Sequence, residues 1–86
     1  RMRACYERGL TRDPRLRGTV DTLFVIDAEG KVASATSYRS SLPDPKVIRC
    51  ILDVYRTLRF PRPREGTARV LYPLVFTPRI DEQDGG

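Results

Sequence analysis

The sequence has no histidine and no long apolar run, and both absences narrow the range of functions. Histidine is the most frequent general base in enzymes, and a serine nucleophile needs a base beside it. The serines have no obvious base near them: Ser34, Ser37, Ser40 and Ser41. The carboxylates fall mostly in expected turns, caps and the tail, and the lone turn glycines Gly30 and Gly66 do not form a phosphate loop. We therefore expect no catalytic residue, no cofactor and no enzyme activity.

The missing apolar run also predicts that these 86 residues contain neither a transmembrane helix nor a signal peptide. The 86 residues allow one domain. Such a domain would bury only about 60% of the surface that its unfolded chain exposes, so its stability would be marginal without a covalent cross-link or a partner. The chain starts with Arg1 rather than methionine, and a helical pattern is under way at Met2. We expect a piece of a longer protein, whose targeting or anchoring segment lies upstream.

The only two cysteines are Cys5 and Cys50. Two cysteines without histidine do not complete a tetrahedral site, so we expect no metal. An even number in a small domain permits one disulfide, whereas two buried thiols would act as small hydrophobic side chains. The compartment decides between these alternatives, because disulfides persist in oxidising spaces.

The net charge of +5 and the pI of about 9.8 have two interpretations. One is an acidic partner such as nucleic acid or a membrane surface, and the other is a solvated basic surface. We favour the second, because the arginines are spread along the chain with carboxylates among them. RNA-binding sheets display aromatic side chains on an open face, whereas Phe24, Tyr72 and Phe76 share parity with the apolar residues and are expected in the core. A nucleic-acid-binding module therefore remains a less favoured alternative.

A β-hairpin is predicted from Gly18 to Ser41. Side chains of its first strand alternate between the two faces of the sheet. The residues expected on one face are Val20, Thr22, Phe24 and Ile26. Asp27-Ala28-Glu29-Gly30 supplies a turn, with a capping aspartate first and a glycine that tolerates positive φ last. The return strand is expected from Lys31 to the serines at 40 and 41.

Two helices flank the hairpin. The first is expected from Arg1 to about Leu10, with Cys5 and Tyr6 in the middle of its apolar stripe, and Leu16 is expected to be an apolar plug. The second begins after the N-cap Asp44 and runs from Pro45 to about Leu58. Its stripe has helical spacing: Val47, Cys50, Ile51, Val54, Tyr55 and Leu58.

The third strand is predicted from Ala68 to Thr77, with Pro73 indicating an edge strand whose proline nitrogen faces outward. We expect an α+β domain over residues 1–80 with the order αββαβ, followed by a polar flexible tail over 81–86. The predicted sheet is antiparallel, with the strands in the order second, first, third and both helices on one face.

The helix-free face and the third strand together suggest a binding surface. Leu23, Val25, Leu71 and Val75 would form an exposed apolar patch, which a small monomer usually covers. An extended peptide can add to the neighbouring edge by backbone hydrogen bonds. The partner-binding residues that we predict are Leu23, Val25, Val70, Leu71, Tyr72, Leu74, Val75 and Phe76. The alternatives are a second copy of the chain, or cover by other parts of a longer protein.

An ordered set of motifs resembles the TonB C-terminal domains. The run GTVDTLFVIDAEGKVASA resembles that family's hairpin, the LRF-P-R-P element its R/W-R-F-x-P signature, and VLYPLVF its last strand. Cys5-Tyr6, the DPRLRG run and Cys50 resemble the AgmX/PglI C-terminal branch, which is common in myxobacterial gliding-motility and envelope proteins. The resemblance covers roughly residues 3 to 79 and departs at Leu58, where the family often has tryptophan.

This resemblance implies a periplasmic domain of a protein anchored in the inner membrane. Such domains bind a short extended segment of an outer-membrane protein at the edge of the last strand, and they transmit force from a proton-driven inner-membrane motor. In the gliding branch, whose layout is similar, periplasmic domains contact outer-membrane or periplasmic components. An oxidising periplasm implies that Cys5 and Cys50 form a disulfide between the two helices.

Overall fold

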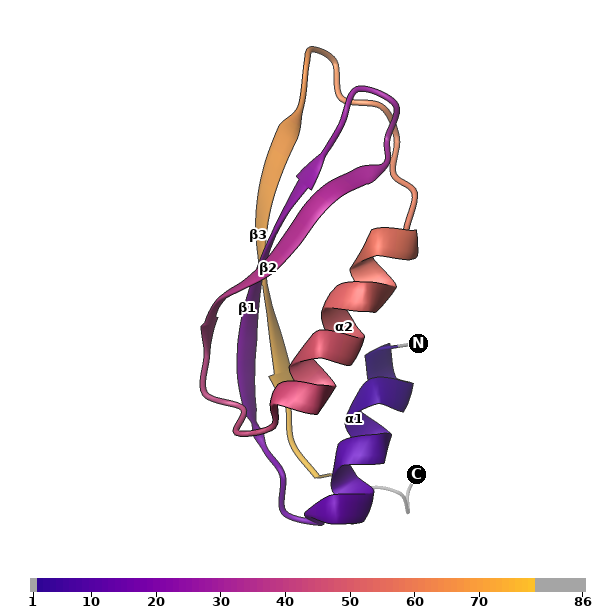
Figure 1. The fold of residues 1–86 in the computed structure, drawn as a ribbon. Helices are drawn as coiled ribbons and strands as arrows, with labels where there is room; N and C mark the ends of the chain where they lie inside the picture. Colours follow the sequence, from indigo (N-terminus) through magenta and orange to yellow (C-terminus); the bar gives the residue numbers. More distant parts are fainter. Residues whose placement is uncertain (1, 79–86) are drawn as a thin grey trace, which may run out of the picture.

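In the computed structural model, which describes residues 2–78, the elements follow the predicted order of helix, strand, strand, helix and strand (Figure 1). They are α1 (Met2–Arg12), β1 (Gly18–Ile26), β2 (Val32–Ser40), α2 (Pro45–Thr57) and β3 (Ala68–Phe76). The three strands form an antiparallel sheet in the order β2-β1-β3, which confirms the predicted α+β fold and topology. The predicted helix start at Arg1, residues 79–80 and the predicted tail over 81–86 lie outside the described residues.

The turn between β1 and β2 forms as its sequence predicts. One carboxylate oxygen of Asp27 accepts hydrogen bonds from the backbone N–H groups of Glu29 and Lys31, both at 2.9 Å. Gly30 has a φ of +87°, a conformation that favours glycine. The return strand begins at Val32 rather than at Lys31, because Lys31 pairs with Arg59 of the α2–β3 connection in an isolated bridge.

Both helices end close to the predicted positions. Helix α1 continues to Arg12, two residues past the expected Leu10, and stops before Pro14. Asp44 caps α2 by accepting hydrogen bonds from the backbone N–H groups of Lys46 and Val47. This cap satisfies amides that have no partner inside the helix.

The core lies between the sheet and α2. The predicted inward residues of β1 are all buried: Val20, Thr22, Phe24 and Ile26. They face the apolar stripe of α2, where Val47, Ile51 and Tyr55 are buried. Leu16 is buried between α1 and β1 as predicted. The strand order follows from this burial, since the most apolar strand occupies the centre of the sheet.

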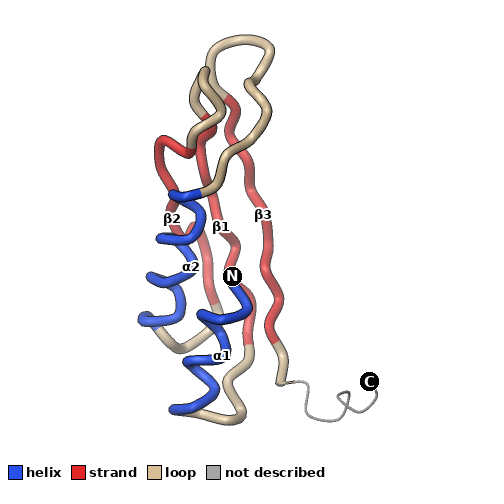
Figure 2. The backbone as a smooth tube through the Cα atoms, turned by 90° about the vertical axis from the view of Figure 1, so that its right-hand side faces the viewer, coloured by secondary structure: helices blue, strands red, loops and turns tan. Residues whose placement is uncertain are grey.

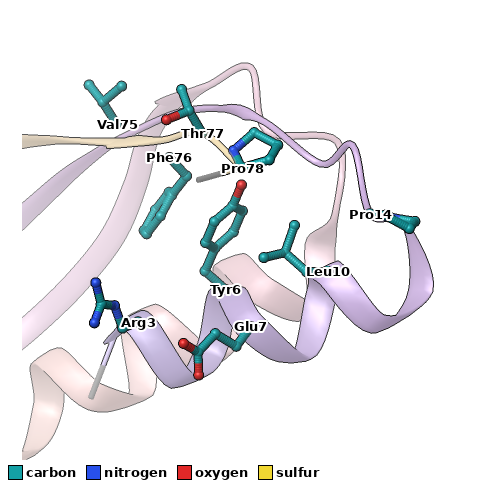
Figure 3. Close-up of a pocket in the computed structure, with 9 residues that line it drawn as sticks. All are labelled: Arg3, Tyr6, Glu7, Leu10, Pro14, Val75, Phe76, Thr77 and Pro78. Atoms are coloured by element: carbon teal, nitrogen blue, oxygen red, sulfur yellow. The ribbon is translucent and has the colours of Figure 1, made fainter. Parts of the chain in front are cut away.

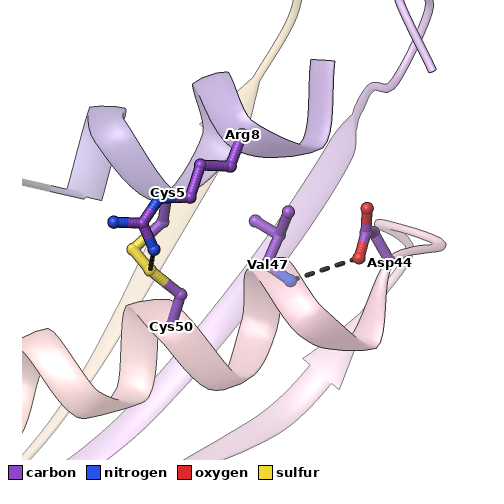
Figure 4. Close-up of a disulfide and its surroundings, with 5 residues drawn as sticks. All are labelled: Cys5, Arg8, Asp44, Val47 and Cys50. Carbon is purple, nitrogen blue, oxygen red and sulfur yellow. Dashed lines mark hydrogen bonds between the residues drawn. A yellow bond between two sulfur atoms is a disulfide. The ribbon is translucent and has the colours of Figure 1, made fainter. Parts of the chain in front are cut away.

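A disulfide joins α1 to α2, which decides between the two alternatives for the cysteines (Figure 4). The sulfur atoms of Cys5 and Cys50 are 2.05 Å apart, and the two residues are separated by 45 positions in the sequence. The Arg8 guanidinium lies 4.0 Å from the Cys50 sulfur. Helix α2 packs on β1 and β2, whereas α1 packs mainly on α2. The disulfide therefore ties α1 to α2, the helix that covers β1 and β2.

Candidate partner-binding edge

Strand β3 is paired along one edge and free along the other. Its nine residues pair in register with β1, from Gly18 opposite Phe76 to Ile26 opposite Ala68. No strand among residues 2–78 lies on its other side (Figure 2). Pro73 lies in this edge strand, opposite Asp21, where the lack of an N–H group is tolerated. A free edge of this kind presents backbone donors and acceptors that can pair with another chain.

On the helix-free face, the four residues of the predicted apolar patch do not form one continuous surface. Leu71 is 54% exposed and lies opposite Leu23, which is half-buried. Val75 is 71% exposed but lies opposite Thr19, two positions beyond Pro73. The half-buried Val25 lies opposite Arg69 rather than an apolar residue. The exposed apolar surface therefore follows the edge of β3 more than the centre of the sheet.

The expectation that Tyr72 belongs to the core is wrong. Its side chain is 54% exposed, whereas Val70, Leu74 and Phe76 on the same face of β3 are half-buried. The physical reason is the position of the helices, because α2 packs on β1 and β2 and does not extend over β3. Tyr72 nevertheless stays attached through its backbone, since its carbonyl oxygen accepts a hydrogen bond from the Thr22 hydroxyl at 2.8 Å. The exposed phenol ring adds apolar and polar surface to the free edge.

A groove of about 710 Å³ lies where α1 meets the end of β3 (Figure 3). Tyr6 forms its floor: its ring is 4.8 Å from that of Phe76, and its hydroxyl donates to the Leu16 carbonyl oxygen at 2.5 Å. The other lining residues are Arg3, Glu7, Leu10, Pro14, Val75, Thr77 and Pro78. Sequence reasoning missed this groove, because its walls are far apart in the chain. Val75 belongs to both the groove and the free edge, so the two features are continuous.

Two buried tyrosines, Tyr6 of α1 and Tyr55 of α2, are neutral. Burial raises the pKa of Tyr6, an effect opposed by Arg17 and reinforced by Asp13. Burial also raises the pKa of Tyr55, although its hydrogen bond with the Thr22 hydroxyl acts in the opposite direction. Both phenols therefore keep their protons at neutral pH and act as hydrogen-bonding groups of the core.

Searches for a metal site and a membrane-spanning helix within the described residues, and for similar known proteins with the sequence as a whole, found none. Residues 2–78 contain no cluster of three or more acidic, cysteine or histidine side chains that could hold a metal ion. No helix in that range is both long and apolar enough to cross a bilayer. Comparisons with protein-family models, curated proteins and solved structures found no match to this chain.

Proposed function

We propose that this chain is a non-enzymatic interaction module that binds an extended segment of a protein partner along the free edge of β3. The observation that carries the proposal is the coincidence of an unpaired strand edge with three exposed apolar side chains on the same strand. These are Leu71, Tyr72 and Val75, which are 54%, 54% and 71% exposed. Strand addition uses such an edge, because backbone hydrogen bonds supply affinity and alternate side chains supply specificity.

The geometry defines what the bound segment must offer. Side chains on one of its faces would continue the Leu23–Leu71 surface, and those on the other would lie beside Tyr72 and approach the groove floored by Tyr6. The partner segment should therefore be apolar at positions on both faces. Pro73 lacks an N–H group, so the added ladder loses one donor near its middle.

The resemblance to TonB C-terminal domains supplies the cellular setting of this proposal. The domain would be periplasmic, part of a protein anchored in the inner membrane, and would couple an energised inner-membrane motor to periplasmic or outer-membrane partners in the cell envelope. Gliding motility is the process that the AgmX/PglI branch suggests. The Cys5–Cys50 disulfide supports an oxidising compartment, where such bonds persist.

The test uses peptides selected on the folded domain from a random library of extended sequences. Titration followed by NMR should shift amides of residues 68–76, together with that of Tyr6. The variants Leu71→Asp and Val75→Asp should abolish binding, whereas Tyr38→Asp should retain it. Tyr38 is the matched control because it is 59% exposed on β2, at the opposite edge of the sheet. Shifts centred on β2, or on arginines and lost with salt, would contradict the proposal.

A self-associating envelope domain is the second candidate, and the same observation favours it. Two copies could pair their β3 edges and cover each other's Leu71, Tyr72 and Val75. Sedimentation over a range of concentrations distinguishes the two functions. A mass that doubles with concentration, and falls back to one copy in Val75→Asp, would favour self-association over binding of a different protein.

A further inference from the structure

One end of the molecule carries a cluster of cations that the β3 edge does not use. Two connections meet there, the β1–β2 turn and the segment between α2 and β3 (Figure 1). We name this cluster the cationic tip, and its members are all exposed: Lys31, Arg59, Arg62, Arg64 and Arg69. We propose that the cationic tip docks on the phosphate groups of an anionic phospholipid surface.

The backbone of the tip is held in place by contacts between its two connections. The N–H of Phe60 donates to the carbonyl oxygen of Gly30 at 2.8 Å, and Lys31 bridges to Arg59. A Cβ atom on Gly30 would lie 2.1 Å from the carbonyl oxygen of Phe60, so the approach requires glycine. The Phe60 ring stacks on Phe24 of the core at 5.6 Å. The arginines around Phe60 are therefore presented from an anchored segment, which lowers the entropy lost on binding.

The cations of the tip are not neutralised by ion pairs. Within residues 2–78, the ion pairs are Arg12 with Asp44 and Arg56 with Asp53, and neither pair belongs to the tip. Three carboxylates share this end of the molecule, namely Asp27, Glu29 and Glu65, so five cations less three anions leave a formal charge of +2. The Asp27 carboxylate is half-buried and engaged by the turn amides.

The residue types favour phosphate, and their surroundings favour a lipid surface over nucleic acid. Four of the five cations are arginines, whose planar guanidinium groups match phosphate oxygens with two hydrogen bonds. Recognition of single-stranded nucleic acid adds stacking on exposed aromatic rings. The only aromatic side chain in residues 27–31 and 58–69 is Phe60, which is half-buried against Phe24.

The shape of the molecule lets this contact coexist with partner binding. The described chain measures 44 by 26 by 16 Å, and the tip lies at one end of the long dimension (Figure 2). Strand β3 starts at the tip and runs away from it, and the groove beside Tyr6 lies near the other end (Figure 1). An end-on contact with a flat surface would leave the β3 edge accessible. The proposal is independent of partner binding at β3, so either can fail alone.

The experiment measures binding of the folded domain to vesicles of phosphatidylglycerol and phosphatidylcholine, with vesicles of phosphatidylcholine alone as the reference. The variant Arg59→Gln/Arg62→Gln/Arg64→Gln should bind the anionic vesicles about fivefold less per arginine removed, or roughly a hundredfold less in all, at low salt. Binding of the unaltered domain should weaken as salt rises. The double variant Arg62→Gln/Arg64→Gln serves if the triple variant does not fold.

The matched control removes the same charge elsewhere. The variant Arg15→Gln/Arg17→Gln/Arg49→Gln changes three exposed arginines outside the tip and should bind the anionic vesicles nearly as well as the unaltered domain. If both triple variants lose affinity for the anionic vesicles equally, the proposal is overturned, because binding would then depend on net charge alone. Failure to bind anionic vesicles would also overturn it, as would tighter tip-dependent binding to single-stranded DNA at the same salt.

Discussion

Removing the Cys5–Cys50 disulfide should destabilise this domain severely. The bond closes a loop whose ends are 45 positions apart. In the chain-entropy treatment, a loop of that size restricts the unfolded chain by about 4 kcal/mol at 25 °C. A domain of this length has a total free energy of unfolding of about 4 to 13 kcal/mol. The disulfide therefore accounts for a large share of the stability, and its loss should lower Tm by about 15 to 30 °C.

The measurement compares urea and thermal unfolding of the oxidised domain, the reduced domain and the variant Cys5→Ala/Cys50→Ala. Alanine is the better replacement for Cys5, because that side chain is only 2% exposed. A serine hydroxyl there would be buried without a hydrogen-bond partner. Mass spectrometry first establishes that the oxidised form is two hydrogens lighter than the dithiol form. The control is the alanine variant with and without reductant, which should unfold identically.

The decrease in the free energy of unfolding distinguishes the possible effects of the disulfide. If the free energy of unfolding falls by less than about 1 kcal/mol in both the reduced domain and the alanine variant, restriction of the unfolded chain is not the main effect of the disulfide. Such a result would mean that the unfolded chain already holds α1 near α2, or that strain in the native bond offsets the restriction. A loss confined to α1, seen as faster amide exchange in residues 2–12 alone, would show that α1 unfolds separately from the sheet.

Three further substitutions test the α2 cap, the close approach of Gly30 to Phe60, and the hydrogen bonds of Thr22. Asp44→Ala should cost about 1 kcal/mol through loss of the α2 cap, measured by urea unfolding. Burial raises the pKa of Asp44, but hydrogen bonds from Arg12 and the first-turn amides outweigh it and hold the pKa below its usual value. The contribution should therefore be full at neutral pH and disappear as acid titrates the folded carboxylate; a difference from Asp44→Ala that persists in strong acid would contradict this sign. Gly30→Ala should destabilise by more than about 1 kcal/mol, because φ is +87° and the added Cβ meets the Phe60 carbonyl oxygen, whereas wild-type stability would show that this approach can relax. Thr22→Val should cost about 1 to 3 kcal/mol, because it removes the hydrogen-bond partner of the buried Tyr55 hydroxyl; an unchanged midpoint would mean that water replaces it.

The elements could be predicted because their signals are local. Alternation in β1, the Asp27–Gly30 turn and the Asp44-Pro45 cap each act over a few residues, and the structure confirms all three. Errors at element ends, by contrast, have non-local causes. For example, β2 starts one residue late because Lys31 pairs with Arg59, a residue that no local pattern connects to it.

The candidate site was predicted in part. The edge position of β3 and the exposure of Leu71 and Val75 follow from chain order and alternation, and the structure confirms both. The exposure of Tyr72 could not be predicted, because alternation assigns a face to a residue but does not show whether a helix covers it. The proposed binding role of all these residues stays a prediction.

The sequence by itself determined the order of the elements, the strand at the centre of the sheet and the two cysteines available for a bond, since periodicity, capping and apolar content act within each segment. Tertiary structure alone decided that α2 covers β1 and β2 but not β3, that α1 and the end of β3 enclose a groove, and that cations from two connections gather at one tip. These features depend on the packing of residues far apart in the chain, which is set by the whole core and not by any one stretch.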